Sequence, residues 1–238
     1  MKLVHCSPLS PILLLTLPFA GAKQKISLQW AICDSDPQET LVKLGLSSTT
    51  PPYKENPITY YDEQPPVHIH SGIMFRTKTN KGRPLSTIKV RFDKETSNVP
   101  GFVTCGWDRY GYNSPAYSCE KRCPLDPAAP EEIWHREQVE FAERYQDINW
   151  TALTAYGPYP NAKWKVRING HKAKFDDVVA EGLHLMEIET KVPEAKAHDF
   201  LEATMRYLRD RGVALCRLQE GKTMRLFRAM GLAGEDEL

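Results

Sequence analysis

The stretch GIMFRTKTNKGRPLSTIKVRF, from Gly72 to Phe92, decides how the rest of the chain is interpreted. It predicts two strands joined by a turn at residues 81–84, because Gly and Pro are typical turn residues between strands. Side chains alternate between the two faces of a strand. One face of this hairpin is therefore apolar, and the other carries the cations Arg76, Lys78, Lys89 and Arg91. Such a pattern indicates either a basic face in water or a cationic surface that binds a polyanion.

The overall composition is that of an ordinary globular protein. The chain has 238 residues, of which 41% are hydrophobic and 26% charged, and these fractions argue against wholesale disorder. Lys and Arg number 31 against 30 Asp and Glu, which leaves a net charge of +1. The bulk charge therefore indicates neither a nucleic acid nor a membrane surface as a partner. Any affinity for anions has to come from local clustering.

The first 22 residues have the pattern of a secretory signal peptide. Lys2 precedes an apolar run at residues 11–19, and Ala20-Gly-Ala22 offers a small-residue cleavage site near Ala22. The run is too short to span a bilayer. We therefore expect a secreted, extracellular protein with no membrane segment. Its mature chain, residues 23–238, is expected to be a single domain with a cysteine-containing insertion at about 100–128.

Five cysteines remain after such a cleavage: Cys33, Cys105, Cys119, Cys123 and Cys216. An odd number in an exported chain predicts up to two disulfides and one spare thiol. The Gly-, Tyr- and Pro-rich insertion favours a disulfide from Cys105 to either Cys119 or Cys123. A zinc site built from these cysteines and His135 is the alternative. Asn149-Trp-Thr151 is a sequon for glycosylation, as expected of a secreted glycoprotein.

Further strands and helices are expected along the chain. Capping residues and apolar spacing predict helices at residues 34–46, 130–145 and 195–212. Alternation predicts strands at residues 24–32, 58–62, 67–71, 163–168, 172–178, 183–192 and 214–218. His68 and His70 share a face of the expected strand at 67–71. Such a pair occurs in metal sites, although exposed strand histidines are commoner.

The basic alternation of the first hairpin returns near the C-terminus. Lys163, Lys165 and Arg167 share one strand face, and Glu187 and Glu189 share a face of a later strand. Many short antiparallel strands with little helix favour an α+β fold, an antiparallel β-barrel of about eight strands with flanking helices. Cations that face such a lumen are costly to bury unless a bound anion offsets their charge.

In their order, these segments resemble the CYTH superfamily of triphosphate tunnel metalloenzymes. The resemblance rests on Tyr60-Tyr-Asp62, Gly72-Ile-Met-Phe-Arg76-Thr-Lys78, Thr87-Ile-Lys89-Val-Arg91, Lys165-Val-Arg167 and Glu187-Ile-Glu189. It implies a metal-dependent triphosphatase, a phosphoric anhydride hydrolase that acts on a small triphosphate-like polyanion and on no specific nucleic acid. It implies that substrate is bound by Arg76, Lys78, Lys89, Arg91, Lys165, Arg167, Arg217 and Lys222. It further implies catalysis by Glu187, Glu189 and Lys89, with Mg²⁺ or Mn²⁺ held by Glu187 and Glu189.

The first strand departs from the family pattern. The family opens with Glu-x-Glu-x-Lys, whereas this chain has Ser27, Gln29 and Ala31 at those places. Ser and Gln offer only neutral oxygens, and hard divalent cations need anionic ones. Three functions therefore compete: metal-dependent hydrolysis of triphosphate or polyphosphate, polyanion binding by a catalytically degenerate secreted protein of the same fold, and a structural role with the cations in water. The sequence leaves the preferred anion and the oligomeric state open.

Overall fold

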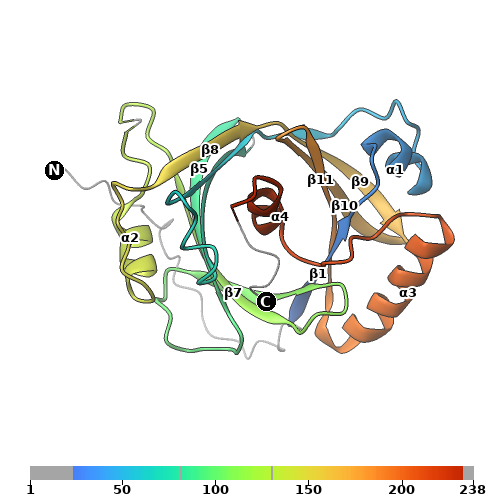
Figure 1. Cartoon of the computed structure of the whole chain (residues 1–238). Helices are drawn as coiled ribbons and strands as arrows, with labels where there is room; N and C mark the ends of the chain where they lie inside the picture. The colour runs from blue at the N-terminus through green and yellow to red at the C-terminus, as the bar shows by residue number, and fades with distance from the viewer. Residues whose placement is uncertain (1–23, 81, 130, 233–238) are drawn as a thin grey trace.

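A computed structural model of the protein describes residues 24–80, 82–129 and 131–232 (Figure 1). The expected signal peptide and its cleavage site lie outside these ranges, as does Lys81 of the expected turn. Within the described ranges, no helix is long and apolar enough to cross a membrane.

The described strands form one mixed sheet of eleven strands that curves around a central space (Figure 1). In chain order the strands are β1 Lys25–Ile32, β2 Lys54–Glu55, β3 Ile58–Asp62, β4 Ile73–Asn80, β5 Arg83–Phe92, β6 Thr104–Tyr110, β7 Ala116–Pro124, β8 Thr154–Tyr159, β9 Asn161–Ile168, β10 His171–Ala180 and β11 Leu183–Pro193. Their order in space is β2-β9-β10-β11-β1-β6-β7-β5-β4-β3-β8.

The expected α+β class is confirmed, but the expected closed antiparallel barrel is wrong. The sheet has more strands than expected, it is not closed into a barrel, and it is not wholly antiparallel, because β1 pairs with β6 in parallel. The chain passes from β8 through the single residue Pro160 into β9, so these two strands continue one another and do not pair side by side. The short β2 occupies the remaining edge of β9. The ends of the hydrogen-bonded order are therefore β2 and β8.

The hairpin expected at residues 72–92 is confirmed as β4 and β5. Met74 lies opposite Lys89 and Arg76 opposite Thr87, so the basic residues share one face. Gly72 precedes the hairpin with a φ of +77°, and a Cβ there would lie 3.0 Å from the carbonyl oxygen of Arg91. Only glycine allows the chain to enter β4 this close to β5. The apolar face packs beneath helix α2, Arg136–Glu143, which buries Phe141 against it.

The cysteine-containing segment is a second hairpin of the sheet, whereas a loop insertion was expected there. β6 and β7 pair with each other, and β7 also pairs with β5. A disulfide joins Cys105 and Cys119, which lie directly opposite each other on the two strands. This settles the open choice in favour of Cys119. Because both sulfur atoms are in the disulfide, they cannot ligate zinc, and the zinc alternative is wrong.

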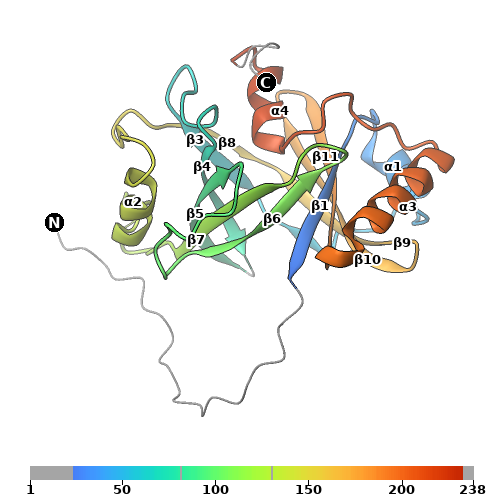
Figure 2. The same cartoon turned by 90° about the horizontal axis from the view of Figure 1, so that it is seen from below.

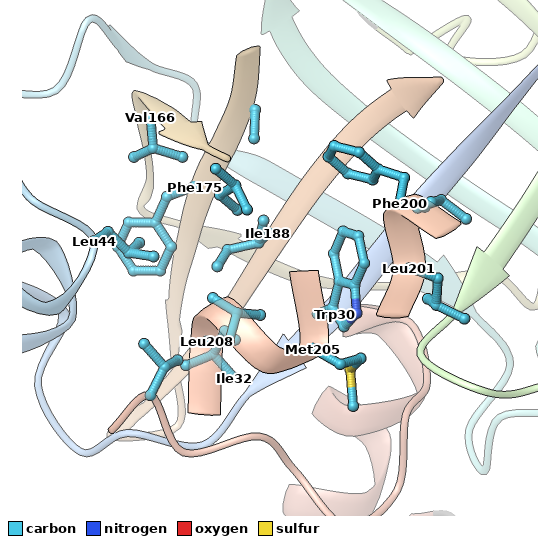
Figure 3. Close-up of a cluster of buried hydrophobic side chains, with 14 of the residues drawn as sticks. Trp30, Ile32, Leu44, Val166, Phe175, Ile188, Phe200, Leu201, Met205 and Leu208 are labelled. Atoms are coloured by element: carbon cyan, nitrogen blue, oxygen red, sulfur yellow. The ribbon is translucent and has the colours of Figure 1, made fainter. Parts of the chain in front are cut away.

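A large apolar core lies between the sheet and two helices, α1 Pro37–Lys43 and α3 Ala197–Asp210, on its outer face (Figures 1 and 3). The 3-10 turn η1, Glu194–Lys196, leads directly into α3. Figure 3 shows Trp30 from β1 among Phe200, Leu201 and Met205 of α3. The apolar stripe of residues 195–212 thus predicted α3 correctly, because one face of the helix had to be buried.

Residues 67–71 form a turn, so the strand expected there is wrong. The Asp62 carboxylate accepts hydrogen bonds from the backbone N–H groups of Val67, His68 and Ile69 at 2.8 to 3.0 Å, which holds the segment in a turn. His68 is buried, and its Nδ1 lies 3.1 Å from Gln146 Oε1. This histidine therefore has a structural environment, and it does not share a strand face with His70.

The C-terminal segment also differs from expectation. At the expected strand 214–218, the described chain forms only an isolated bridge between Ile32 and Leu215. A disulfide joins Cys33 and Cys216, and the chain then enters helix α4, Lys222–Ala229, which the alternation did not reveal. Figure 1 shows α4 in the middle of the curved sheet, and Figure 2 places it at one end. Its Phe227 is buried against Tyr156, with ring centroids 5.0 Å apart.

Candidate functional site

The concave side of the sheet encloses a cavity of about 650 Å³. Eleven Lys and Arg side chains and five carboxylates line it among the described residues, an excess of six cationic groups. The cationic side chains are Lys25, Lys54, Arg76, Lys78, Lys89, Arg91, Arg122, Lys163, Lys174, Lys191 and Lys222. The acidic ones are Asp108, Glu120, Asp176, Glu187 and Glu189. A concave surface with this excess of basic groups attracts anions.

Two arginines in this cavity have buried N–H groups with no acceptor. Arg76 Nε and Arg91 Nε are both buried and without a hydrogen-bond partner among the described residues. Arg76 Nη2 lies 3.9 Å from Glu120 Oε2, and the Arg91 guanidinium lies 5.4 Å from the centre of the Tyr110 ring. An unsatisfied buried donor costs about 1–3 kcal/mol. The geometry therefore leaves two guanidinium groups that a ligand with anionic oxygens would satisfy.

Lys89, on the same strand as Arg91, is paired with a carboxylate from the β6–β7 hairpin. Lys89 of β5 forms a close ion pair with Asp108 of β6. Burial works against charge on Asp108, but the Lys89 ammonium beside it holds the pKa of this carboxyl below its ordinary value. Burial lowers the pKa of Lys89 below its ordinary value, and the Asp108 carboxylate opposes that shift and holds the amino group on the cavity wall. A ligand phosphate would compete with Asp108 for it.

Lys78 is a cavity lysine that loses its charge well below the ordinary pKa of a lysine. Its pKa is lowered to about 6, first by the Arg76 guanidinium beside it and then by burial. The neutral amine is therefore the main form of Lys78 at pH 7.

Lys222, the first residue of α4, reaches the acidic part of the cavity. Its Nζ donates a hydrogen bond to Glu187 Oε1 at 2.7 Å and lies 3.4 Å from Asp176 Oδ1. Lys163 of β9 forms a close ion pair with the same Asp176. Burial disfavours charge on Lys222, but the nearby Glu187 carboxylate raises the pKa of Lys222 above its ordinary value. Burial lowers the pKa of Lys163 to about 7. The amino groups of Lys163 and Lys222 and the carboxylates of Asp176 and Glu187 thus form one buried network.

The residues present do not fit Mg²⁺ or Mn²⁺ at Glu187 and Glu189. Glu187 already accepts the hydrogen bond from Lys222, and Glu189 accepts one from Ser27 Oγ at 3.3 Å and lies 3.5 Å from Lys174 Nζ. Gln29 donates to Ser27 Oγ and adds no negative charge. The described ranges hold no group of three or more His, Cys, Asp or Glu side chains placed to hold a metal ion. Hard divalent ions need several oxygen ligands, preferably carboxylates.

The structure brings together five of the eight expected phosphate-binding cations. Arg76, Lys78, Lys89, Arg91 and Lys222 line the cavity, and Lys165, Arg167 and Arg217 do not. The last three side chains are exposed.

Lys165 and Arg167 lie farther along β9 and border an adjoining hollow of about 890 Å³, which shares Tyr53, Lys174, Glu189 and Lys191 with the cavity. The Lys165 Nζ lies 5.0 Å from the Tyr53 ring, and Arg167 donates to the Gly170 carbonyl oxygen at 2.9 Å. Tyr53 lines the cavity that holds the other five cations, but the side chains of Lys165 and Arg167 do not.

Sequence reasoning missed the contribution of β6 and β7 to the cavity. Asp108, Glu120 and Arg122 line it from the segment that was expected to be a loop. A signal was present, because Ser118, Glu120 and Arg122 alternate with Cys119 and Cys123 in the manner of a strand with one apolar face. The Gly and Tyr content of the segment concealed this alternation.

Comparison with known proteins supports the fold. No family model matches the sequence, and no curated protein sequence does. A candidate adenylyl cyclase from Hippeastrum with a dominant triphosphatase activity matches with a TM-score of 0.55 at 13% identity, over 86% of this chain and 95% of that one. A candidate adenylate cyclase from Bacillus halodurans matches with a TM-score of 0.58 at 13% identity, over 85% and 98%. At this identity the likeness shows a shared tunnel-like fold.

Proposed function

We propose that the cavity binds a small polyphosphate anion, such as a triphosphate, through Arg76, Arg91 and the lysines around them. The observation that carries this proposal is the pair of buried Nε–H groups that have no acceptor among the described residues. Phosphate oxygens would satisfy both donors, and guanidinium groups recognise phosphate with paired, charge-assisted hydrogen bonds. The anion would also offset the cost of enclosing an excess of basic groups.

The distribution of the cations favours a ligand with several charges over a single phosphate. Arg91 and Lys89 project from β5, Lys163 from β9 and Lys222 from α4, so cations enter the cavity from different walls. A linear anion with several phosphate groups can contact more than one wall at once. The triphosphatase activity of the Hippeastrum neighbour supports the same class of ligand.

Hydrolysis of that anion is a second candidate function, favoured by the same neighbour's activity. Phosphoryl transfer depends mostly on positioning and on stabilising the charge that develops on the phosphate oxygens. Here Lys89 and the two arginines would stabilise that negative charge, and Glu187 or Glu189 would orient the attacking water. Both carboxylates already accept hydrogen bonds from neighbouring side chains, and for this reason binding is our first proposal.

Calorimetric titration with sodium tripolyphosphate, pyrophosphate and orthophosphate tests both candidates. We expect tripolyphosphate to bind most tightly and to raise the thermal midpoint, because a ligand that binds only the folded state stabilises it. Phosphate release is followed in the same samples, with and without Mn²⁺. Release would establish hydrolysis, and binding without release would establish the binding function. No heat and no thermal shift with any of the three anions would refute both.

Binding should be coupled to protonation of Lys78. Its free pKa is about 6, and a bound anion raises that value because it favours the ammonium form. Between pH 6 and the higher pKa of the complex, the complex binds more protons than the free protein, so affinity should increase as the pH falls from 8 to 6. Below pH 6 Lys78 is already charged, and this gain ends.

The proton uptake is measured by titration in buffers of different ionisation enthalpy. The control is Lys78→Gln, in which uptake should fall by the contribution of this amine. The ligand's own titration is the same in both proteins and therefore cancels. Equal uptake in Lys78→Gln and the original chain would contradict the assignment to Lys78.

We also propose that the mature chain is one secreted domain. The disulfides Cys33–Cys216 and Cys105–Cys119 are compatible with an extracellular protein, and Asn149 of the sequon is exposed. Expression in a eukaryotic secretory host, with the mass of the secreted product measured before and after removal of N-glycans, tests this. A product that stays in the cell with residues 1–22 attached would exclude it.

A further inference from the structure

We infer that the cavity binds its polyphosphate without a divalent metal ion, because the Lys222 ammonium occupies the place between the carboxylates that a metal would need. The inference rests on the proposed function and specifies how the same site neutralises charge. It departs from the Mg²⁺ or Mn²⁺ that the sequence resemblance implies.

The contacts of Lys222 carry the inference. Its Nζ is 2.7 Å from Glu187 Oε1 and 3.4 Å from Asp176 Oδ1, so it bridges the carboxylates of two neighbouring strands. Those two residues are direct cross-strand partners of β10 and β11. A cation that bound both carboxylates would have to displace the ammonium. The side chains of Lys222, Asp176 and Glu187 are only 14%, 8% and 9% exposed. Expelling a buried ammonium from its partners is costly.

The local charge balance supports the same conclusion. Three carboxylates, Asp176, Glu187 and Glu189, face the amino groups of Lys163, Lys222 and Lys174. Each carboxylate thus already has a basic partner, with which a divalent ion would have to compete. In a site that is already neutralised, the ligand's negative charge is met by the remaining cations, Arg76 and Arg91 first among them.

The first strand, β1, supplies no carboxylate that could act as a further metal ligand. Ser27 and Gln29 of β1 face the cavity next to Glu189, and they are hydrogen-bonded to each other at 3.4 Å. Their backbone register places Gln29 opposite Glu189. Carboxylates at these two positions would join Glu189 and Glu187 on one face of the cavity. The neutral side chains instead leave the pair without enough anionic oxygen to hold a hard ion.

The test is a titration of the full mature chain with sodium tripolyphosphate in EDTA, and again in excess Mg²⁺. We expect binding in EDTA, and weaker apparent binding in Mg²⁺, because free Mg²⁺ associates with the ligand in solution. Binding that requires Mg²⁺ would overturn the inference while leaving the proposed function intact. Absence of binding under both conditions would instead refute the proposed function.

A metal titration without phosphate gives an independent readout. We expect Mn²⁺ to show no binding to the original chain by electron paramagnetic resonance, and Ser27→Glu/Gln29→Glu/Lys222→Met to gain a bound Mn²⁺ ion, because this variant adds two carboxylates and removes the ammonium. The matched control Ser27→Ala/Gln29→Ala keeps Lys222 and should gain none. If the triple variant does not fold, as judged by circular dichroism, Lys222→Met replaces it, because removal of the ammonium alone frees Glu187 and Asp176. Tight Mn²⁺ binding by the original chain would contradict the inference, as would a folded triple variant or a folded Lys222→Met variant that gains no metal.

Discussion

Arg76→Ala/Arg91→Ala is expected to lose polyphosphate binding by about 100-fold to 10,000-fold. Hydrogen bonds to charged groups contribute about 1.5–3 kcal/mol each, and each 1.4 kcal/mol is tenfold in affinity. Both guanidinium groups line the cavity and have a buried Nε–H without an acceptor among the described residues. The variant therefore removes two Nε–H donors that no described residue uses, together with the long Arg76–Glu120 ion pair and the Arg91–Tyr110 ring contact. Because these two contacts are weak, the folded protein should be little destabilised. Calorimetric titration with tripolyphosphate and urea unfolding measure the two effects.

The control for this variant is Arg206→Ala, which removes an exposed arginine from the outer helix α3. It should bind tripolyphosphate as the original chain does, because exposed charges far from a site are screened by salt. Arg76→Lys/Arg91→Lys separates charge from geometry, since lysine keeps the charge but lacks the planar fork. Unchanged affinity in Arg76→Ala/Arg91→Ala would remove the main support for the proposed function.

Loss of the Cys33–Cys216 disulfide should produce the largest change in stability. This disulfide spans 183 residues, and closing a long loop restricts the unfolded chain most. We expect Cys33→Ala/Cys216→Ala to lower the free energy of unfolding by about 2–5 kcal/mol in a urea titration. Because Cys216 precedes α4, the variant should also hold Lys222 less firmly and weaken tripolyphosphate binding where the protein is still folded.

The second disulfide provides the matched comparison. Cys105 and Cys119 are separated by only 14 residues, so Cys105→Ala/Cys119→Ala should cost about 2 kcal/mol less than the other double variant on chain-entropy grounds. It should also leave Lys222 in place, because it lies on β6 and β7. If the two variants were equally destabilised, the loop-length explanation would be wrong. Unaltered binding in Cys33→Ala/Cys216→Ala would show that α4 is held by packing alone.

The first basic hairpin could be predicted in detail because local rules suffice for it. Its turn residues, its two-residue period and its apolar face all belong to one short segment, and the structure confirms the shared face of Arg76 and Lys89. The turn at Asn169 and Gly170 follows from equally local chemistry, since both residues adopt a positive φ, of 48° and 77°. Helix α3 was predictable for the same reason, from its apolar stripe.

Features that depend on distant partners could not be predicted in this way. In β6, Trp107 to Tyr110 pair in parallel with β1, which lies far away in the sequence. Residues 214–218 alternate like a strand, but the disulfide to Cys33 and the packing of α4 determine their path. Local propensity is a weak guide where tertiary contacts compete with it.

By itself, the sequence determined that cations lie on one face of several strands and that the first strand lacks the carboxylates a metal would need. Only the tertiary structure decided which of these cations meet. Lys163 and Arg167 share a face of β9, yet only Lys163 lines the cavity, and Lys222 reaches Glu187 from a helix that no alternation predicted. The physical reason is that alternation sets the face on which a side chain lies, whereas the curvature of the sheet and the position of α4 set which side chains approach one another.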